Sequence, residues 1–158
     1  MEKKKKLLII GAGGHGKVIA DIALQLGTYQ KVAFLDDNTK IASVIGCERE
    51  GTMQQLHLES RETEVFVAVG NSKIRQTLCD QVKELGFSMP TLIHPHAVVA
   101  NDVLLGKGTV VMAGAVINSG VKLGEGVIVN TSSSVDHDCE VGDFSHIAVG
   151  AQDRKSVV

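Results

Sequence analysis

The chain has 158 residues, a formal net charge of −2, and 3% aromatic residues with no Trp. Its length allows one medium domain or two small ones. The small net charge gives no electrostatic reason to expect a nucleic acid or an acidic membrane as partner, and the scarcity of aromatic residues argues against stacking platforms for bases.

Targeting and redox features are few. Lys3–Lys6 is expected to be a solvated lead-in, as short charge runs usually are. A signal peptide is not expected, because the apolar run Leu7–Ile10 is too short and glycines follow it at once. No apolar run reaches membrane-spanning length. The three cysteines, Cys47, Cys79 and Cys139, lack ligand spacing, so we expect reduced, buried thiols in a cytoplasmic protein, and no metal site.

The first half of the chain predicts a small α/β unit with a parallel sheet. Strands are expected at 6–10, 32–35 and 65–69, with a further short strand at 41–45 and a helical turn at 52–58. The first helix ends at Gly27 and turns one apolar face to the core: Val18, Ile19, Ile22, Ala23 and Leu26. The second is expected to be capped by Ser72 and stopped by Gly86, with a stripe of Ile74, Leu78, Val82 and Leu85.

The second half repeats every six residues. The repeat places a large aliphatic residue at Ile93, Val99, Leu105, Val111, Ile117, Leu123, Val129, Val135, Val141 and Ile147. Four residues later comes a mostly small one: Ala97, Val103, Thr109, Ala115, Val121, Val127, Ser133, Cys139, Ser145 and Ala151. A period of six fits a short strand plus a tight corner, which is the pattern of a parallel β-helix, a β-solenoid. We expect two domains, residues 1–89 and 90–158, with Pro90 and Pro95 beside the change of period.

The glycine cluster Gly11–Gly16 matches G-x-G-x-x-G between a predicted strand and helix, and Asp36 lies where an NAD site would have its ribose-binding acid. Glycines admit a phosphate close to the backbone, and a helix N-terminus favours an anion. A plain strand-to-helix turn is the alternative. Because the α/β part has fewer than ninety residues, a single Rossmann-like nucleotide half fits better than a full NAD site.

Further polar residues follow the strands of this unit. His15 and Lys17 are candidates to meet a phosphate, although Lys17 fits a solvated helix position equally well. Asp36 and Asp37 end one strand and are placed for ribose hydroxyls or a base edge, although Asp37 also fits a cap for the next turn. Gly70 and Asn71 end the next strand at the same sheet edge. Their convergence favours a binding crevice.

In the repeat region, His137 is a candidate general base, because imidazole titrates near neutral pH. Asp136 and Asp138 flank it, and either carboxylate is placed to hold the ring. The alternative is a surface histidine beside two acids. His146 lies nine residues later, half a coil away, so one site using both histidines would need two chains. A structural hydrogen bond is the other reading of His146, while His57, His94 and His96 are expected at the surface or in linkers.

Several motifs resemble one acetyltransferase family. They are LIIGAGGHGK (residues 8–17), FLDDN (34–38), VAVGN (67–71) with Arg75, NTSS (130–133), DHDC (136–139) and GDFSH (142–146). The chain is similar in these motifs to the sialic acid O-acetyltransferases and the nucleotide-sugar N-acetyltransferases of the bacillosamine and perosamine pathways. The resemblance implies a left-handed β-helix that holds acetyl-CoA, an N-terminal domain that holds the sugar nucleotide, and a trimer as working unit.

The resemblance also implies residue roles. Asp138 is the expected partner of His137, although the family usually has Glu there and Asp is one methylene shorter. Asn130 is implied near the acceptor, and His146 at the thioester end of acetyl-CoA. The substrate-binding set would be Gly13, Gly14, His15, Asp36, Asp37, Gly70, Asn71 and Asn130. An amino group on a UDP-sugar is the first choice of acceptor, and a sialic acid hydroxyl the second.

The repeat is expected to end early. The next hexad would begin with an aliphatic residue where Asp153 stands, and residues 154–158 have no hexad character. Because the family usually continues for several more coils, we expect a shortened β-helix that keeps the base and loses part of the acetyl-CoA groove. A nucleotide-sugar-binding protein without catalysis, or a small NAD-dependent enzyme, are the alternative functions.

Overall fold

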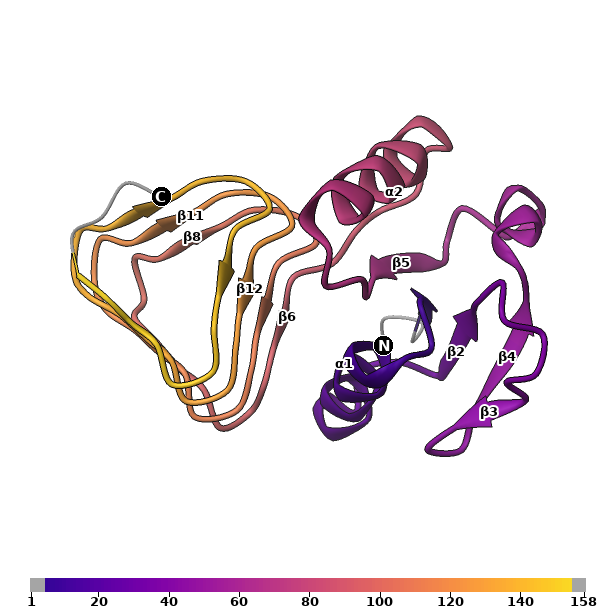
Figure 1. Ribbon diagram of the computed structural model, residues 1–158, viewed down its shortest axis with the longest axis horizontal. Coiled ribbons are helices and arrows are strands. Elements are labelled where there is room, and N and C mark those ends of the chain that lie inside the picture. Colours follow the sequence, from indigo (N-terminus) through magenta and orange to yellow (C-terminus); the bar gives the residue numbers. More distant parts are fainter. Residues whose placement is uncertain (1–4, 155–158) are drawn as a thin grey trace. The chain divides into compact units, whose positions relative to one another are not determined.

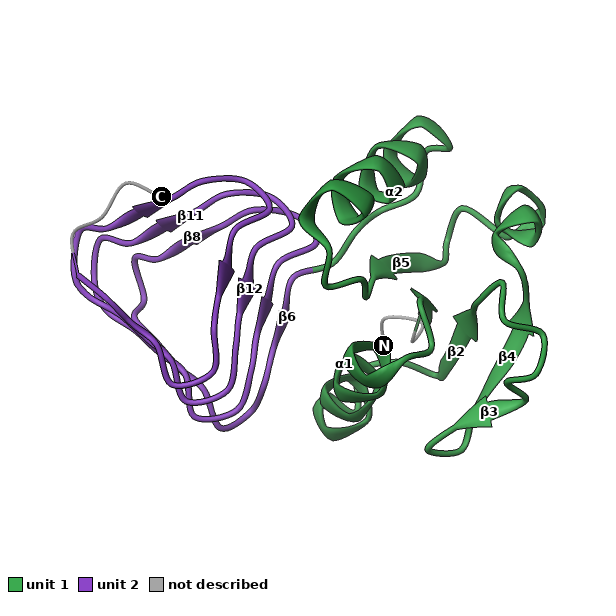
Figure 2. Ribbon diagram, in the orientation of Figure 1, with its two compact units in different colours: residues 1–90 green, residues 91–158 purple. Residues whose placement is uncertain are grey.

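The computed structural model describes residues 5–154, and the chain divides into two compact units, residues 1–90 and 91–158 (Figures 1 and 2). Unit 1 is the α/β part and unit 2 the repeat part; each is described by itself. Lys3, Lys4 and residues 155–158, for which expectations were stated, lie outside the described residues.

Unit 1 contains one five-stranded sheet in the order β3-β4-β2-β1-β5. The strands are β1 (Lys6–Ile10), β2 (Lys31–Leu35), β3 (Ser43–Val44), β4 (Cys47–Gly51) and β5 (Glu64–Val67). Only the short β3 is antiparallel, to β4; the other pairs are parallel, as predicted. The sequence did not predict β4, because its residues Cys-Glu-Arg-Glu-Gly contain no apolar run.

The connections of unit 1 are α1 (Gly14–Leu26), η1 (Met53–Leu58, a 3₁₀ helix) and α2 (Ser72–Glu84). The C-cap Gly27 of α1 is left-handed at φ 64°, as its predicted role requires. The predicted face of α1 is right for Ile19, Ile22 and Ala23, which are buried, whereas Val18 is 41% exposed.

The predicted N-cap of α2 was wrong by one position, and its predicted apolar stripe was right only in part. Its N-cap is Asn71, not Ser72, because the Asn71 side chain accepts a hydrogen bond from the Ile74 amide at 3.0 Å. Of the predicted stripe, Val82 is buried and Leu78 and Leu85 are partly buried, whereas Ile74 is 53% exposed. The other buried residues of α2 are Arg75 and Cys79. An apolar stripe could not reveal this face, because its largest buried member is an arginine.

Unit 2 is a triangular β-helix, whose stacked turns are seen in Figure 1. Its two-residue strands are β6 (Leu92–Ile93), β7 (Val98–Val99), β8 (Leu104–Leu105), β9 (Val110–Val111), β10 (Val116–Ile117), β11 (Lys122–Leu123), β12 (Ile128–Val129), β13 (Ser134–Val135), β14 (Glu140–Val141), β15 (His146–Ile147) and β16 (Gln152–Asp153). They form three parallel sheets, β16-β13-β10-β7, β14-β11-β8 and β15-β12-β9-β6. The predicted six-residue repeat is confirmed.

The register stacks residues eighteen apart. Ile117, for example, pairs with Val99 on one side and with Val135 on the other. Every predicted aliphatic position is the second residue of a strand, and these side chains pack into one core together with the smaller residues four positions later. Burial of these large aliphatic side chains and of the smaller ones beside them holds the coils together.

From residue 108 onward, one corner position in each hexad has a left-handed backbone, with φ between 57° and 78°. These positions are Gly108, Gly114, Gly120, Gly126, Ser132, Asp138, Phe144 and Gly150. The three that carry side chains each lie over a glycine of the preceding coil. A Cβ atom on Gly114, Gly120 or Gly126 would come within 3.1, 2.1 or 2.4 Å of them, respectively. Glycine in one coil therefore makes room for a side chain in the next.

The ladder continues further than the aliphatic pattern indicated. Asp153 pairs with Val135 as the second residue of β16, so the expected stop of the strand pattern at this acid is wrong. Backbone pairing with the coil below does not require an aliphatic side chain. None of the helices in residues 5–154 is long and apolar enough to cross a membrane.

A partly buried tyrosine lies at the amino edge of the sheet in unit 1. The Tyr29 hydroxyl donates to Glu64 Oε2 at 2.7 Å, and Lys5 Nζ lies 3.3 Å from Glu64 Oε1. Burial, reinforced by the hydrogen bond to Glu64, raises the pKa of Tyr29 above its ordinary value. The folded chain therefore keeps the phenolic proton at a pH where the unfolded chain loses it.

This tyrosine makes stability fall at high pH. Its contribution is complete below the unfolded pKa of about 10 and declines as the pH rises beyond it. Tyr29 is the only Tyr and there is no Trp, so phenolate absorbance reports on it alone. We expect this absorbance to appear only as the chain unfolds, and near pH 10 in urea-unfolded protein. Reversible ionisation of the native protein near pH 10 would contradict the assignment.

Candidate active site

A histidine–carboxylate pair lies at a corner of unit 2. The corner follows β13, and His137 Nδ1 lies 2.8 Å from Asp138 Oδ2. Because a carboxylate accepts, Nδ1 donates when the ring is neutral, which leaves the lone pair on Nε2. The His137 side chain is 56% exposed, so the ring is accessible to solvent.

The two acids beside His137 do different things. Asp136 Oδ1 accepts the backbone N–H of His137 at 2.8 Å, and its contact is to the main chain rather than the ring. Asp138 has a left-handed backbone at φ 58°, which turns its short side chain toward the ring. The missing methylene relative to Glu therefore does not prevent contact with Nδ1.

A second polar pair belongs to another side of the prism. Asn130 Nδ2 lies 3.0 Å from His146 Nε2, across the paired strands β12 and β15. Asn130 Oδ1 accepts from the Thr131 amide at 2.7 Å, so the amide NH₂ is the group that donates to His146. The structure brings Asn130 and His146 together, while His137 follows a strand of a different sheet.

The glycine loop of unit 1 joins β1 to α1. Gly11 has φ 102°, and a Cβ there would lie 2.7 Å from the Ala68 carbonyl oxygen. A Cβ on Gly16 would lie 1.9 Å from the Gly11 carbonyl oxygen, so only glycine allows the helix to start this close to the strand. Gly13 and Gly14 have open space at their Cβ positions. The outer side of the loop is therefore accessible to a ligand.

The two acids after β2 hold the backbone. Asp36 accepts from the Ala12 amide and from the Asn38 amide, each at 2.7 Å. Asp37 accepts from the Met53 amide at 3.0 Å, at the start of η1, which is the capping role considered for it. Asp36 thereby ties its own loop to the glycine loop.

The loop after β5 depends on a residue whose role the sequence did not reveal. Arg75 is 1% exposed and donates to the carbonyl oxygens of Val69 at 3.0 Å and Gly70 at 2.8 Å. Burial lowers the pKa of this guanidinium. Asn71 caps α2 directly after. The only sequence signal for Arg75 was its place in the family motif.

The predicted site residues of unit 1 thus gather at the carboxyl edge of the sheet. Gly11 donates its amide to Leu35 and packs against Ala68, so the loops after β1, β2 and β5 are in contact. His15, in the first turn of α1, is partly buried, and Lys17 is exposed. This edge combines a helix N-terminus with an open glycine loop, which suits a phosphate.

The remaining histidines differ in burial. His57 and His96 are exposed as expected, but His94 is only 7% exposed, and its Nδ1 accepts from the His96 amide at 2.9 Å. The surface assignment of His94 was therefore wrong; the ring closes a turn. Among residues 5–154, no group of three or more His, Cys, Asp or Glu side chains is arranged to hold a metal ion.

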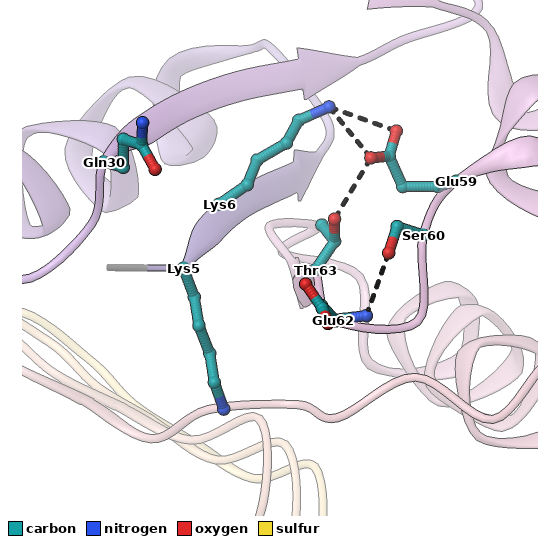
Figure 3. Close-up of a pocket in the computed structure, with 7 residues that line it drawn as sticks. All are labelled: Lys5, Lys6, Gln30, Glu59, Ser60, Glu62 and Thr63. Carbon is teal, nitrogen blue, oxygen red and sulfur yellow. Dashed lines mark hydrogen bonds and ion pairs between the residues drawn. The ribbon is translucent and has the colours of Figure 1, made fainter. Parts of the chain in front are cut away.

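A pocket of about 580 Å³ lies at the opposite, amino edge of unit 1 (Figure 3). It is lined by Lys5, Lys6, Gln30, Glu59, Ser60, Glu62 and Thr63. Lys6 Nζ lies 3.1 Å from both oxygens of Glu59, which also accepts from the Thr63 hydroxyl at 3.0 Å. Lys6, Glu59 and Thr63 thus bind one another, and we assign the pocket no ligand.

The two units define a class of protein: a small nucleotide-binding type of sheet followed by a hexapeptide-repeat, left-handed β-helix. Residues 6–82 match the PglD N-terminal domain. The acetyltransferase domain of PglB from Neisseria gonorrhoeae, solved with acetyl coenzyme A, is 48% identical, with a TM-score of 0.92 over 95% of this chain and 73% of that one.

Two curated relatives are also named as nucleotide-sugar N-acetyltransferases. A GDP-perosamine N-acetyltransferase of Escherichia coli O157:H7 is 30% identical over 95% of this chain and 70% of its own length. A UDP-N-acetylbacillosamine N-acetyltransferase of Bacillus subtilis (strain 168) is 32% identical over 69% of this chain, which spans about half, 52%, of that relative. The chain belongs to the PglD-type family of nucleotide-sugar acetyltransferases.

The buried arginine allows a test of the loop after β5. Arg75→Met removes the donors to Val69 and Gly70 while keeping an apolar stem in place. Losing these two hydrogen bonds from a buried guanidinium should cost about 1–3 kcal/mol in the free energy of unfolding. Chemical denaturation measures this, with the exposed Lys73→Ala on the same helix as control. Equal stability of both variants would contradict a structural role for Arg75.

Proposed function

We propose that this chain transfers an acetyl group from acetyl-CoA to an amino group of a nucleotide-linked sugar, with His137 as general base. The observation that carries the proposal is the 2.8 Å contact between His137 Nδ1 and Asp138, which leaves Nε2 as acceptor on an accessible ring. Family membership supports the reaction, and the acetyl coenzyme A complex of the Neisseria relative supports the donor.

The chemistry follows from this pair. The lone pair of the sugar amine attacks the thioester carbonyl carbon, a C–N bond forms and the C–S bond breaks. His137 Nε2 takes the proton that the amine loses and passes it to the departing sulfur. Asp138 stabilises the imidazolium that exists between these two transfers and keeps Nε2 free before them. Acetyl-CoA is the co-substrate, and the proposed reaction uses no metal.

Unit 1 is proposed to hold the sugar nucleotide at the carboxyl edge of its sheet. The open space beside Gly13 and Gly14 at the start of α1 suits the phosphates, with His15 next to them in the chain. Asp36, Asp37, Gly70 and Asn71 are proposed to line the same crevice. Asp36 and Asp37 already bind backbone amides, so their contribution is to shape the loops as well as to accept from a ligand.

Asn130 and His146 are proposed to act as one unit near the reacting groups. Their mutual hydrogen bond fixes the His146 ring, which we assign to the thioester end of acetyl-CoA, with Asn130 toward the acceptor. His137 lies on a different side of the prism, so a centre that uses both histidines needs two chains. This geometry supports an oligomer with active sites between subunits, and the family resemblance makes a homotrimer the proposed form.

The acceptor is proposed to be a UDP-sugar amine, with a sialic acid hydroxyl as second candidate. Thiol release from acetyl-CoA, measured with a panel of UDP-linked and GDP-linked amino sugars and free sialic acid, separates these acceptors. Binding of UDP-sugar without turnover would instead mark a non-catalytic binder. The cysteines Cys47, Cys79 and Cys139 are buried and not in disulfides, which supports a reducing compartment, and we propose the cytoplasm.

Removing the base tests the central assignment. His137→Gln and Asp138→Asn are each expected to lower kcat by about 10²–10⁴, because the first removes the proton acceptor and the second favours the wrong tautomer. His57→Gln, an exposed histidine of unit 1, is the matched control and should keep full turnover. Thiol release at saturating substrates measures kcat. Undiminished turnover of His137→Gln would remove this residue from the base role.

Mixing variants tests the shared site. His137→Gln and His146→Gln chains are each expected to be inactive alone. If each centre takes its histidines from two chains, unfolding and refolding them together should restore part of the wild-type activity, because some interfaces pair two intact residues. Light scattering checks that the mixture has the mass of the wild-type oligomer. Mixed oligomers without recovered activity would place both histidines in one chain's site.

A further inference from the structure

One corner column of the prism carries Asp102, Gly120 and Asp138, each eighteen residues from the next. Asp102 Oδ2 accepts from the Ser119 hydroxyl at 2.7 Å and from the Gly120 amide at 3.1 Å. The Asp138 amide in turn donates to the Ser119 carbonyl oxygen at 3.0 Å. Polar bonds therefore connect three successive coils directly beneath the His137–Asp138 pair.

The absence of a side chain at Gly120 determines where the Asp138 carboxylate can lie. A Cβ atom on Gly120 would be 2.1 Å from Asp138 Oδ1 and 3.1 Å from its Cγ. The other oxygen, Oδ2, is the one that contacts His137 Nδ1. One oxygen of the carboxylate thus occupies the space over glycine while the other holds the imidazole.

We propose that Gly120 is a positioning residue for the His137–Asp138 pair, and that Asp102 keeps the Ser119–Gly120 corner in the place this requires. A methyl group at Gly120 can be relieved by rotating the Asp138 side chain, and that rotation takes Oδ2 away from Nδ1. The catalytic consequence rests on the proposed acetyl transfer, whereas the effect on the histidine ring does not.

The Asp102 carboxylate is suited to holding the Ser119–Gly120 corner in place. The hydrogen bonds from the Ser119 hydroxyl and from the Gly120 amide lower the pKa of Asp102, because they favour its ionised form. An ionised carboxylate is a stronger acceptor than a neutral one. The corner is therefore held by two charge-assisted hydrogen bonds in addition to the strand pairing of β11 (Lys122–Leu123) with β8 (Leu104–Leu105).

The test compares Gly120→Ala with Gly114→Ala. Both glycines have the same left-handed backbone, with φ of 78° and 70°. Over Gly114 the nearest atom is the Ser132 hydroxyl oxygen at 3.1 Å, which can rotate away without touching the pair. We expect Gly120→Ala to lower kcat by about 10²-fold, the scale of a displaced catalytic group, while KM stays within about twofold. Gly114→Ala should stay near the wild-type kcat.

A spectroscopic readout needs no turnover. Nitrogen-15 NMR of labelled histidine distinguishes the Nδ1–H from the Nε2–H form of a neutral ring, and the His137 signal is identified by its loss in His137→Gln. We expect Nδ1–H in the wild type and Gly114→Ala, and a large Nε2–H population in Gly120→Ala. An unchanged ring in Gly120→Ala overturns the proposal. A changed ring in a protein that transfers no acetyl group supports the positioning role and refutes the proposed function.

A double-mutant cycle separates positioning from damage to the fold. Asp138→Gly removes the carboxylate and suits the left-handed backbone at this residue. If Gly120 acts through Asp138, adding Gly120→Ala to Asp138→Gly should change kcat by less than about twofold, since the interaction has already been removed. A further tenfold loss would show that Gly120 acts through the prism itself and would overturn the proposal.

Discussion

The stacking of coils at intervals of eighteen residues is the constraint on which unit 2 depends. Backbone amides of one coil donate to carbonyl oxygens of the next, as the amides of Val116 and Asn118 do with the carbonyls of Ser133 and Val135. The interior accepts only aliphatic or small side chains, because it is a closed triangular tube. Charged side chains therefore lie outside this interior, and His137 lies at one of the corners.

From residue 108 onward, each corner of this kind also requires one residue with a left-handed backbone. Four successive corners meet this requirement with glycine, but Ser132, Asp138 and Phe144 meet it with side chains, each resting over a glycine. A non-glycine residue at positive φ costs conformational energy, on the order of 1–2 kcal/mol. At Asp138 this strained backbone directs the carboxylate to the imidazole, so strain and the candidate catalytic geometry coincide.

The repeat was predictable from sequence because its core is apolar and strictly periodic. The left-handed backbone of Asp138 was not, since the ordinary sequence signal for positive φ is glycine. Arg75 was missed as a buried residue for a related reason: charge predicts exposure unless the carbonyl groups that it binds are known. The glycine loop was predictable as a motif, whereas the bond from Ala12 to Asp36 depends on two strands lying side by side.

The eighteen-residue coil also restricts how the length of such a chain can change over evolution. Deleting a single residue between Gly120 and Asp138 would break their eighteen-residue spacing and shift the aliphatic side chains that follow out of register with the coil before them. Duplication of a whole coil preserves all vertical neighbours, and an insertion that bulges from a corner leaves the strands unmoved. Length variation among homologous prisms should therefore occur as complete turns or as corner loops, with the corner above Gly120 kept free of them.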